Sequence, residues 1–103
     1  MFSIFGKSNF DSVSVNELEG KINLIDVREG YEFKTGHVPS AKNVPLGTIL
    51  TEPEKYLDKT KQYHIICQSG ARSKRACKGL SSKGYNVINV FDGTGAYKKS
   101  LRR

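Results

Sequence analysis

Cysteine is scarce in this sequence: the 103 residues include two, Cys67 and Cys77. Two cysteines cannot supply the disulfide framework of a small secreted domain, and a reducing cytosol keeps such residues as thiols. Neither cysteine is accompanied by the second pair of cysteine or histidine residues that a structural zinc site requires. We therefore expect no metal, and a reactive or a packing role for each cysteine.

Long hydrophobic runs are absent as well. No segment approaches the roughly 18 consecutive apolar residues that a membrane-spanning helix needs. The first residues, MFSIFGKSNF, lack the charged start and the long apolar segment of a signal peptide. We expect a cytoplasmic protein without membrane contact, and the chain length indicates one domain over residues 1–103.

Acidic residues are rare in the second part of the chain. Residues 67–103 contain nine lysines and arginines and a single acid, Asp92, whereas residues 1–66 contain eight basic and nine acidic residues. A basic segment favours anionic partners in general. No aromatic residues alternate with basic ones on a predicted strand, so we expect no nucleic-acid partner.

Short apolar, β-branched segments alternate with segments of helical pattern. Strands are predicted over residues 22–27, 41–44, 62–66 and 86–91. Helices are predicted over residues 15–19, 31–35, 46–50, 54–57 and 73–83. This alternation predicts an α/β domain with a mainly parallel sheet, in which ligands bind at the carboxyl ends of the strands.

Cys67 lies at such a carboxyl end, in the segment CQSGARS that joins the strand at 62–66 to the longest predicted helix. The first N–H groups of a helix have no partner within the helix and carry the positive end of its dipole, so they favour an anion. Gly70 allows successive N–H groups to turn inward as an anion-binding nest. These features favour a thiolate at Cys67, although a small buried side chain at the end of a strand is the alternative interpretation.

Four ordered segments carry a resemblance to a known family: LIDVR at 24–28, YEF at 31–33, GHVPSAKNVP at 36–45 and CQSGARS at 67–73. Together they resemble the single-domain rhodanese-like sulfurtransferases. The resemblance implies an α/β fold whose mainly parallel sheet of about five strands is flanked by helices on both faces.

The resemblance also implies a reaction and its residues. Cys67 would take sulfur from a small anionic donor such as thiosulfate, hold it as a persulfide and pass it to cyanide or a thiol, without metal or organic cofactor. A protein could also serve as sulfur donor or acceptor. The resemblance assigns the anion cradle to the backbone of the following loop, with Arg72 ordering it: Gln68, Ser69, Gly70, Ala71, Arg72 and Ser73.

Two other functions are weighed against this one. Phosphatases of related fold, and the arsenate reductases that resemble them, carry five residues between the cysteine and the arginine, whereas this chain has four between Cys67 and Arg72. A smaller loop suits a sulfur atom better than a tetrahedral oxyanion, so phosphatase or reductase activity is disfavoured. A persulfide relay or docking module that serves a protein partner remains the second hypothesis.

The remaining chemically capable residues have ordinary structural explanations. Asp26 and Arg28 are expected to fix a loop, with Glu32 as a possible partner of Arg28, and His37 to bond across a turn. Cys77 is expected in the core. Two positions depart from the family pattern, since Ser40 replaces a common turn glycine and Tyr97 stands where a tryptophan is frequent. Two basic residues in the first turn of the long helix, Lys74 and Arg75, are expected to attract an anionic donor.

Overall fold

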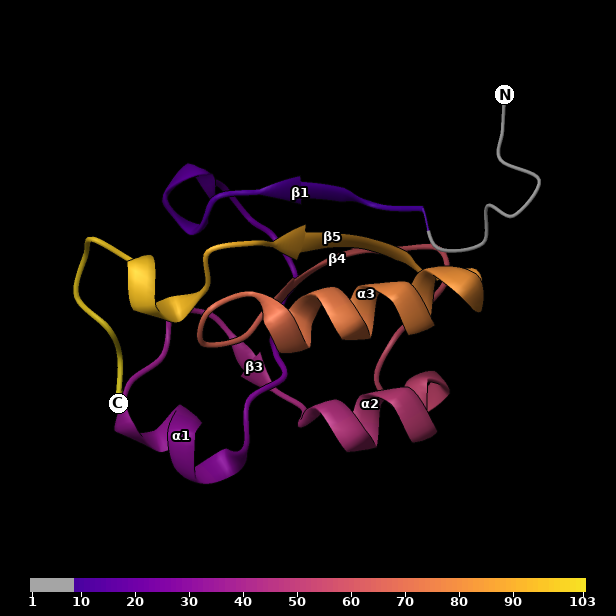
Figure 1. Cartoon of the computed structure of the whole chain (residues 1–103), viewed down its shortest axis with the longest axis horizontal. Coiled ribbons are helices and arrows are strands. Elements are labelled where there is room, and N and C mark those ends of the chain that lie inside the picture. The colour runs from indigo at the N-terminus through magenta and orange to yellow at the C-terminus, as the bar shows by residue number, and fades with distance from the viewer. Residues whose placement is uncertain (1–8) are drawn as a thin grey trace.

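The computed structural model describes residues 9–103, which form a five-stranded parallel sheet with strand order β1-β5-β4-β2-β3 (Figure 1). The strands are β1 (Asp11–Val13), β2 (Leu24–Asp26), β3 (Lys42–Asn43), β4 (Gln62–Ile66) and β5 (Asn86–Val90). The central strand β4 pairs with β2 and β5, for example with Ile65 between Ile25 and Asn89. All carboxyl ends of the strands therefore meet at one edge of the sheet.

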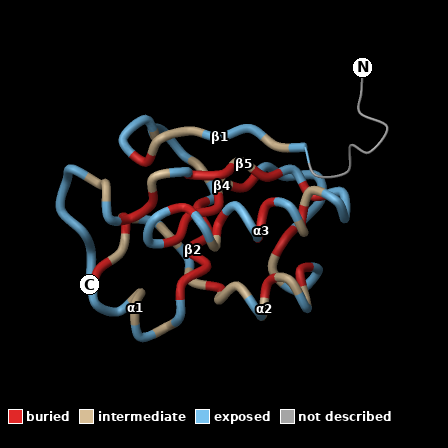
Figure 2. The backbone as a smooth tube through the Cα atoms, viewed as in Figure 1, coloured by how far each residue is buried: buried red, intermediate tan, exposed pale blue. Residues whose placement is uncertain are grey.

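Alternate residues of the strands are buried on opposite faces, and each face has its own hydrophobic cluster. Figure 2 shows buried backbone along β2, β4 and β5. The larger cluster lies under helices α2 (Leu46–Thr51) and α3 (Ala71–Ser82). On α3 the buried positions recur at helical spacing, and Leu80 is fully buried, which contributes roughly 1.5–3 kcal/mol. Helix α3 packs closely on α2, because a Cβ added at Gly79 would lie 2.7 Å from a methyl carbon of Leu50.

Short 3-10 helices cover the other face. Val15 of η1 (Val15–Glu17) and Ala96 of η3 (Thr94–Ala96) pack against the smaller cluster, as does Val38, which follows helix α1 (Gly30–Thr35). The predicted sheet with helices on both faces is confirmed. A third 3-10 helix, η2 (Pro53–Lys55), precedes β4.

The sequence patterns place most elements correctly but miss one strand. The four predicted strands are present, and the helical segment predicted to begin at residue 15 is capped by Ser14, which forms a capping box with Glu17. Strand β1 was not predicted, because three residues with two exposed side chains carry no hydrophobic pattern and acquire their conformation by pairing with β5. The helices predicted at 15–19 and 54–57 are single 3-10 turns.

The two departures from the family pattern are matters of local structure. Ser40 has a φ of 73°, a left-handed conformation that glycine adopts without steric cost. Tyr97 is partly buried and packs against the smaller hydrophobic cluster. Both positions lie away from the Cys67 loop in the sequence, and neither provides a bond to its sulfur.

Within residues 9–103, no helix is long and apolar enough to cross a membrane. The expectation that the chain begins without a signal peptide depends on residues 1–8, which lie outside the described residues.

Candidate active site

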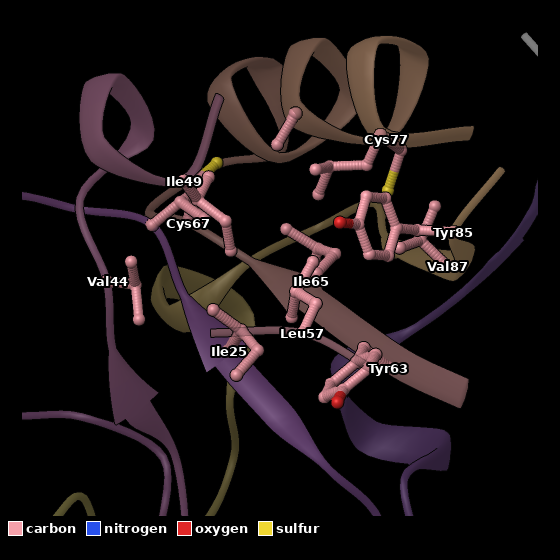
Figure 3. Close-up of a cluster of buried hydrophobic side chains, with 13 residues drawn as sticks. Ile25, Val44, Ile49, Leu57, Tyr63, Ile65, Cys67, Cys77, Tyr85 and Val87 are labelled. Atoms are coloured by element: carbon pink, nitrogen blue, oxygen red, sulfur yellow. The ribbon is translucent and has the colours of Figure 1, made fainter. Parts of the chain in front are cut away.

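The junction between β4 and α3 places Cys67 at the carboxyl edge of the sheet. Strand β4 ends at Ile66, whose carbonyl oxygen accepts the N–H of Val27 at 2.9 Å. Helix α3 begins after Gly70, which has a φ of 105° and turns the chain sharply. The Cys67 side chain is 1% exposed and belongs to the cluster under α2 and α3, where Figure 3 shows it beside Ile49.

The sulfur of Cys67 lies in a small cradle of hydrogen-bond donors. The backbone N–H groups of Gly70 and Ser73 donate to Sγ at 3.1 and 3.3 Å. The thiol of Cys67 donates to the hydroxyl oxygen of Ser73 at 3.5 Å, and that hydroxyl donates in turn to the carbonyl oxygen of Gly70. Of the residues expected in the cradle, Gly70 at the N-cap of α3 and Ser73 in its first turn direct their N–H groups at the sulfur.

The hydrogen bonds of this cradle affect the pKa of Cys67 more than its burial does. Burial by itself raises the pKa of Cys67, but the Ser73 hydroxyl and the backbone N–H groups of Ser73, Gly70 and Ser69 stabilise the thiolate, so the pKa lies below its usual value. The thiol of Cys77 has no such donors, and burial, together with the charge at Cys67, raises its pKa to about 12. Figure 3 shows the two sulfurs well apart, with Cys77 beside Tyr85.

Arg72 does not point into the cradle but ties the loop to helix α1. Its guanidinium donates two hydrogen bonds to the carboxylate of Glu32, at 2.7 and 2.9 Å. Hydrogen bonding to Arg72 lowers the pKa of Glu32 from 4.5 to about 2, against the opposing effect of burial. The predicted pairing of Arg28 with Glu32 is therefore wrong, because Arg72 approaches Glu32 from another element and takes both of its oxygens.

Arg28 instead forms a buried ion pair with Asp26, 2.9 Å between Nη2 and Oδ2. The same guanidinium donates to the side-chain oxygen of Gln68 at 3.2 Å and to the carbonyl oxygen of Gly36 at 2.8 Å. Asn43 donates to the carbonyl oxygens of Asp26 and Arg28. The structural role expected for this pair is confirmed, and through Gln68 it extends to the Cys67 loop.

A second support for the loop comes from the segment after β5 and was not predicted. The N–H of Thr94 donates to the carbonyl oxygen of Cys67 at 2.9 Å, and that of Gly95 to Gln68 at 3.0 Å. At Gly93 an added Cβ would overlap the carbonyl group of Gln68, and at Gly70 it would overlap the carbonyl oxygen of Phe91. Gly93 and Gly95 were the sequence signal that could have indicated this contact. The segment that they contact, at Cys67 and Gln68, lies far from them in the sequence.

The other candidates lie outside the cradle. His37 bonds across a turn through Nδ1 and the carbonyl oxygen of Phe33, 3.0 Å apart, as predicted. Cys77 is fully buried in the core, also as predicted. Lys74 and Arg75, the fourth and fifth residues of α3, are exposed. In residues 9–103 no group of three or more His, Cys, Asp or Glu side chains could hold a metal ion.

Comparisons with known proteins agree with this geometry. The chain is 42% identical over 84 residues to a protein of Bacillus subtilis (strain 168) named "Putative sulfurtransferase YtwF", covering 80% of this chain and 79% of that protein. A protein of the same organism named "Putative sulfur carrier protein YrkF" is 36% identical over 70% of this chain and 39% of its own length.

Solved structures show the same fold. The protein SSP1007 from Staphylococcus saprophyticus superposes with a TM-score of 0.81 at 28% identity, covering 91% of this chain and all of that chain. A structure described as "rhodanese with anions from E. coli" gives a TM-score of 0.70 at 27% identity, covering 81% of this chain and 99% of its own. The family model described as "Rhodanese-like domain" matches residues 13–100. The chain therefore belongs to the family of rhodanese-like domains.

Proposed function

We propose that the protein is a sulfurtransferase that carries sulfane sulfur as a persulfide on Cys67. The observation that carries this proposal is the cradle itself, in which two backbone N–H groups and a hydroxyl converge on one buried sulfur atom. Such preorganised donors stabilise an anionic sulfur and cost no reorganisation during the reaction. Membership of the rhodanese-like family supports the same chemistry.

In the first half-reaction the donor is a small anion such as thiosulfate. The Cys67 thiolate attacks the outer sulfur, the S–S bond of thiosulfate breaks, and its electron pair leaves with sulfite. Cys67 then holds the transferred sulfur as a persulfide anion. The N–H groups of Gly70 and Ser73 donate to Sγ, so they stabilise the attacking thiolate.

In the second half-reaction a thiophilic acceptor removes the outer sulfur. Cyanide or a thiolate attacks that sulfur, the persulfide S–S bond breaks, and Cys67 recovers its thiolate. No oxidant or reductant is consumed, because the sulfane sulfur moves between nucleophiles. Arg72 acts as a positioning residue, since its guanidinium is directed to Glu32 and holds the loop against α1.

The size of the loop separates this proposal from phosphatase or arsenate reductase activity. Four residues lie between Cys67 and Arg72, and two N–H groups of the loop already bond to the cysteine sulfur itself. We propose that the cradle serves a sulfur anion, and we expect no turnover of an aryl phosphate.

Intact-protein mass spectrometry tests the proposal directly. Incubation with thiosulfate should add one sulfur, about 32 Da, and cyanide should remove it with formation of thiocyanate. The Cys67→Ser variant should gain no sulfur, whereas Cys77→Ala should still gain it. If the loaded protein fails to discharge to cyanide or small thiols, the free-standing enzyme is contradicted and the relay hypothesis, which the name of the relative YrkF supports, replaces it.

A further inference from the structure

The segment that follows η3 returns to helix α1 and pairs with the turn behind it. Arg102 and His37 form an isolated antiparallel bridge, in which the N–H of each donates to the carbonyl oxygen of the other at 2.8 Å. Leu101 packs on Gly36, because a Cβ added at Gly36 would lie 3.1 Å from a methyl carbon of Leu101. Figure 1 shows this segment, in yellow, reaching the end of α1. We call residues 101–103 the strap.

Helix α1 depends on such contacts for its position. None of its residues is buried, so hydrophobic packing holds it weakly. The strap supports its last residue as well, since Nε of Arg103 donates to the carbonyl oxygen of Thr35 at 3.1 Å. The strap therefore contacts three successive residues, Thr35, Gly36 and His37, and fixes the turn that follows the helix.

This turn contacts the buried guanidinium of Arg28. The carbonyl oxygen of Gly36 accepts a hydrogen bond from Nη2 at 2.8 Å, and the carboxylate of Asp26 accepts hydrogen bonds from Nε and Nη2. The plane of the guanidinium is therefore set from two sides, by Asp26 and by Gly36. The remaining nitrogen, Nη1, donates to Oε1 of Gln68 at 3.2 Å.

Gln68 is held between Arg28 and the segment after β5. Because a guanidinium only donates, the amide of Gln68 must turn its oxygen to Arg28, and its nitrogen then lies against Gly95. The carbonyl oxygen of Gln68 also accepts the N–H of Gly95 at 3.0 Å. Gln68 directly follows Cys67, so these contacts determine the path of the chain as it leaves the nucleophile.

From this continuous set of contacts we infer that the strap positions the Cys67 loop for sulfur transfer. Arg102 and Leu101 are positioning residues, which act on the loop through Gly36, Arg28 and Gln68. Neither residue bonds to the sulfur. The inference rests on the proposed function, because the step that it affects is the loading of sulfur onto Cys67.

Arg102→Pro tests the bridge to His37, because proline has no N–H to donate. The rate constant for loading by thiosulfate, followed by protein mass, should fall by about fivefold or more, the effect of one lost hydrogen bond. Arg102→Ala retains the N–H and should load about fivefold faster than Arg102→Pro. Lys99→Pro is the control in the same segment, since the N–H of Lys99 has no hydrogen-bond partner among residues 9–103. It should load sulfur as wild type does.

A double-mutant cycle identifies the route through which the strap acts. Gln68→Met removes the oxygen that accepts Arg28 and should itself slow loading. In this background Arg102→Pro should slow loading by less than about twofold, because the contact that carries its effect is already gone. An equal slowing in both backgrounds would overturn the inference, since the strap would then act by another route, such as the contact of α1 with Arg72.

Amide hydrogen exchange provides a readout that needs no sulfur transfer. Arg102→Pro should accelerate exchange at Gly95, whose N–H donates to Gln68, by about fivefold. The N–H of His64 donates to Asn23, away from the Cys67 loop, and should exchange as in wild type. Unchanged exchange at Gly95 would overturn the inference even if loading were slower.

Gly20→Ala separates positioning from loss of stability. Its added carbon has nothing within 4 Å, so the change strains the backbone without touching the contacts between the strap and Gln68. Gly20→Ala should load sulfur at the wild-type rate. If it slowed loading as much as Arg102→Pro does, destabilisation would explain both effects and the inference would fail while the proposed function stood. Failure of the wild type to load sulfur would overturn the proposed function, and this inference with it.

Discussion

At the scale of single residues, Cys67 and Cys77 show that burial does not decide the state of a thiol. Both are almost completely buried and belong to the same hydrophobic cluster. Burial raises the pKa of each, but only Cys67 receives hydrogen bonds from Gly70 and Ser73. The orientation of a few donors therefore lowers the pKa of one buried thiol and leaves that of the other raised.

The hydroxyl of Ser73 provides a direct test of this balance. Replacing Ser73 with alanine should raise the pKa of Cys67 and slow persulfide formation near pH 7 by about tenfold, the effect of losing one hydrogen bond to a charged group, about 1.5 kcal/mol. The pH dependence of thiolate ultraviolet absorbance measures the pKa. Ser82→Ala is the control, because Ser82 also donates to a carbonyl three residues earlier in α3 but far from Cys67. An unchanged pKa in Ser73→Ala would contradict the role of the hydroxyl.

At the scale of elements, the Cys67 loop is held from both sides by segments distant in sequence. The segment after β5 bonds to the backbone at Cys67 and Gln68, and α1 holds Arg72 through Glu32. Few backbone hydrogen bonds join residues within the loop itself. Its shape therefore depends on how closely β5 and α1 approach it.

Because the chain at the end of β5 lies directly against Gly70, one methyl group added at Gly70 should destabilise the protein. Gly70→Ala should destabilise the protein by at least about 3 kcal/mol and abolish sulfur loading, because the added carbon would overlap the carbonyl oxygen of Phe91. Gly20→Ala should cost only about 1–2 kcal/mol, because Gly20 has a φ of +75° but nothing within 4 Å of the added carbon. Chemical denaturation compares the two. Similar losses of unfolding free energy in the two variants would show that the positive φ alone, without the overlap, determines the cost at Gly70.

The contact between α1 and the loop predicts a dependence on pH. The pKa of Glu32 is lowered from 4.5 to about 2, so its carboxylate stabilises the folded state fully above about pH 4.5. This contribution is lost as the pH falls toward 2. Glu32→Gln should therefore reduce the free energy of unfolding by about 1–2 kcal/mol near pH 7, and the difference from wild type should vanish on acidification.

Glu52→Gln serves as the control for Glu32→Gln. Glu52 pairs with Lys55 at 3.3 Å, but both side chains are exposed, so the change should cost less than about 0.5 kcal/mol. If the free energies of unfolding of wild type and Glu32→Gln differed by the same amount from pH 7 to pH 2, the assigned pKa shift of Glu32 would be contradicted.

At the scale of the whole molecule, the fold and the position of the candidate nucleophile follow from local sequence signals. Apolar β-branched runs identify four strands, and the CQSGARS segment places Cys67 between a strand and a helix. The contacts that complete the site were not predictable in this way. The pairing of Arg72 with Glu32 joins residues 40 positions apart, and β1 depends on pairing with β5. Such contacts are decided by packing and leave no periodic signal in either segment.

Cys77 lies in the hydrophobic cluster between α3 and the sheet, so its reactivity reports on the packing of α3. Because Cys77 is fully buried and its pKa is raised to about 12, a thiol reagent should reach Cys77 only when α3 leaves the sheet. Peptide mapping after timed labelling measures the rate at each cysteine. Leu80→Ala, a core truncation costing about 2–5 kcal/mol, should accelerate Cys77 labelling by about 30-fold or more. In Cys67→Ser, Cys77 should stay protected, and rapid labelling there would mean that α3 opens locally without unfolding of the sheet.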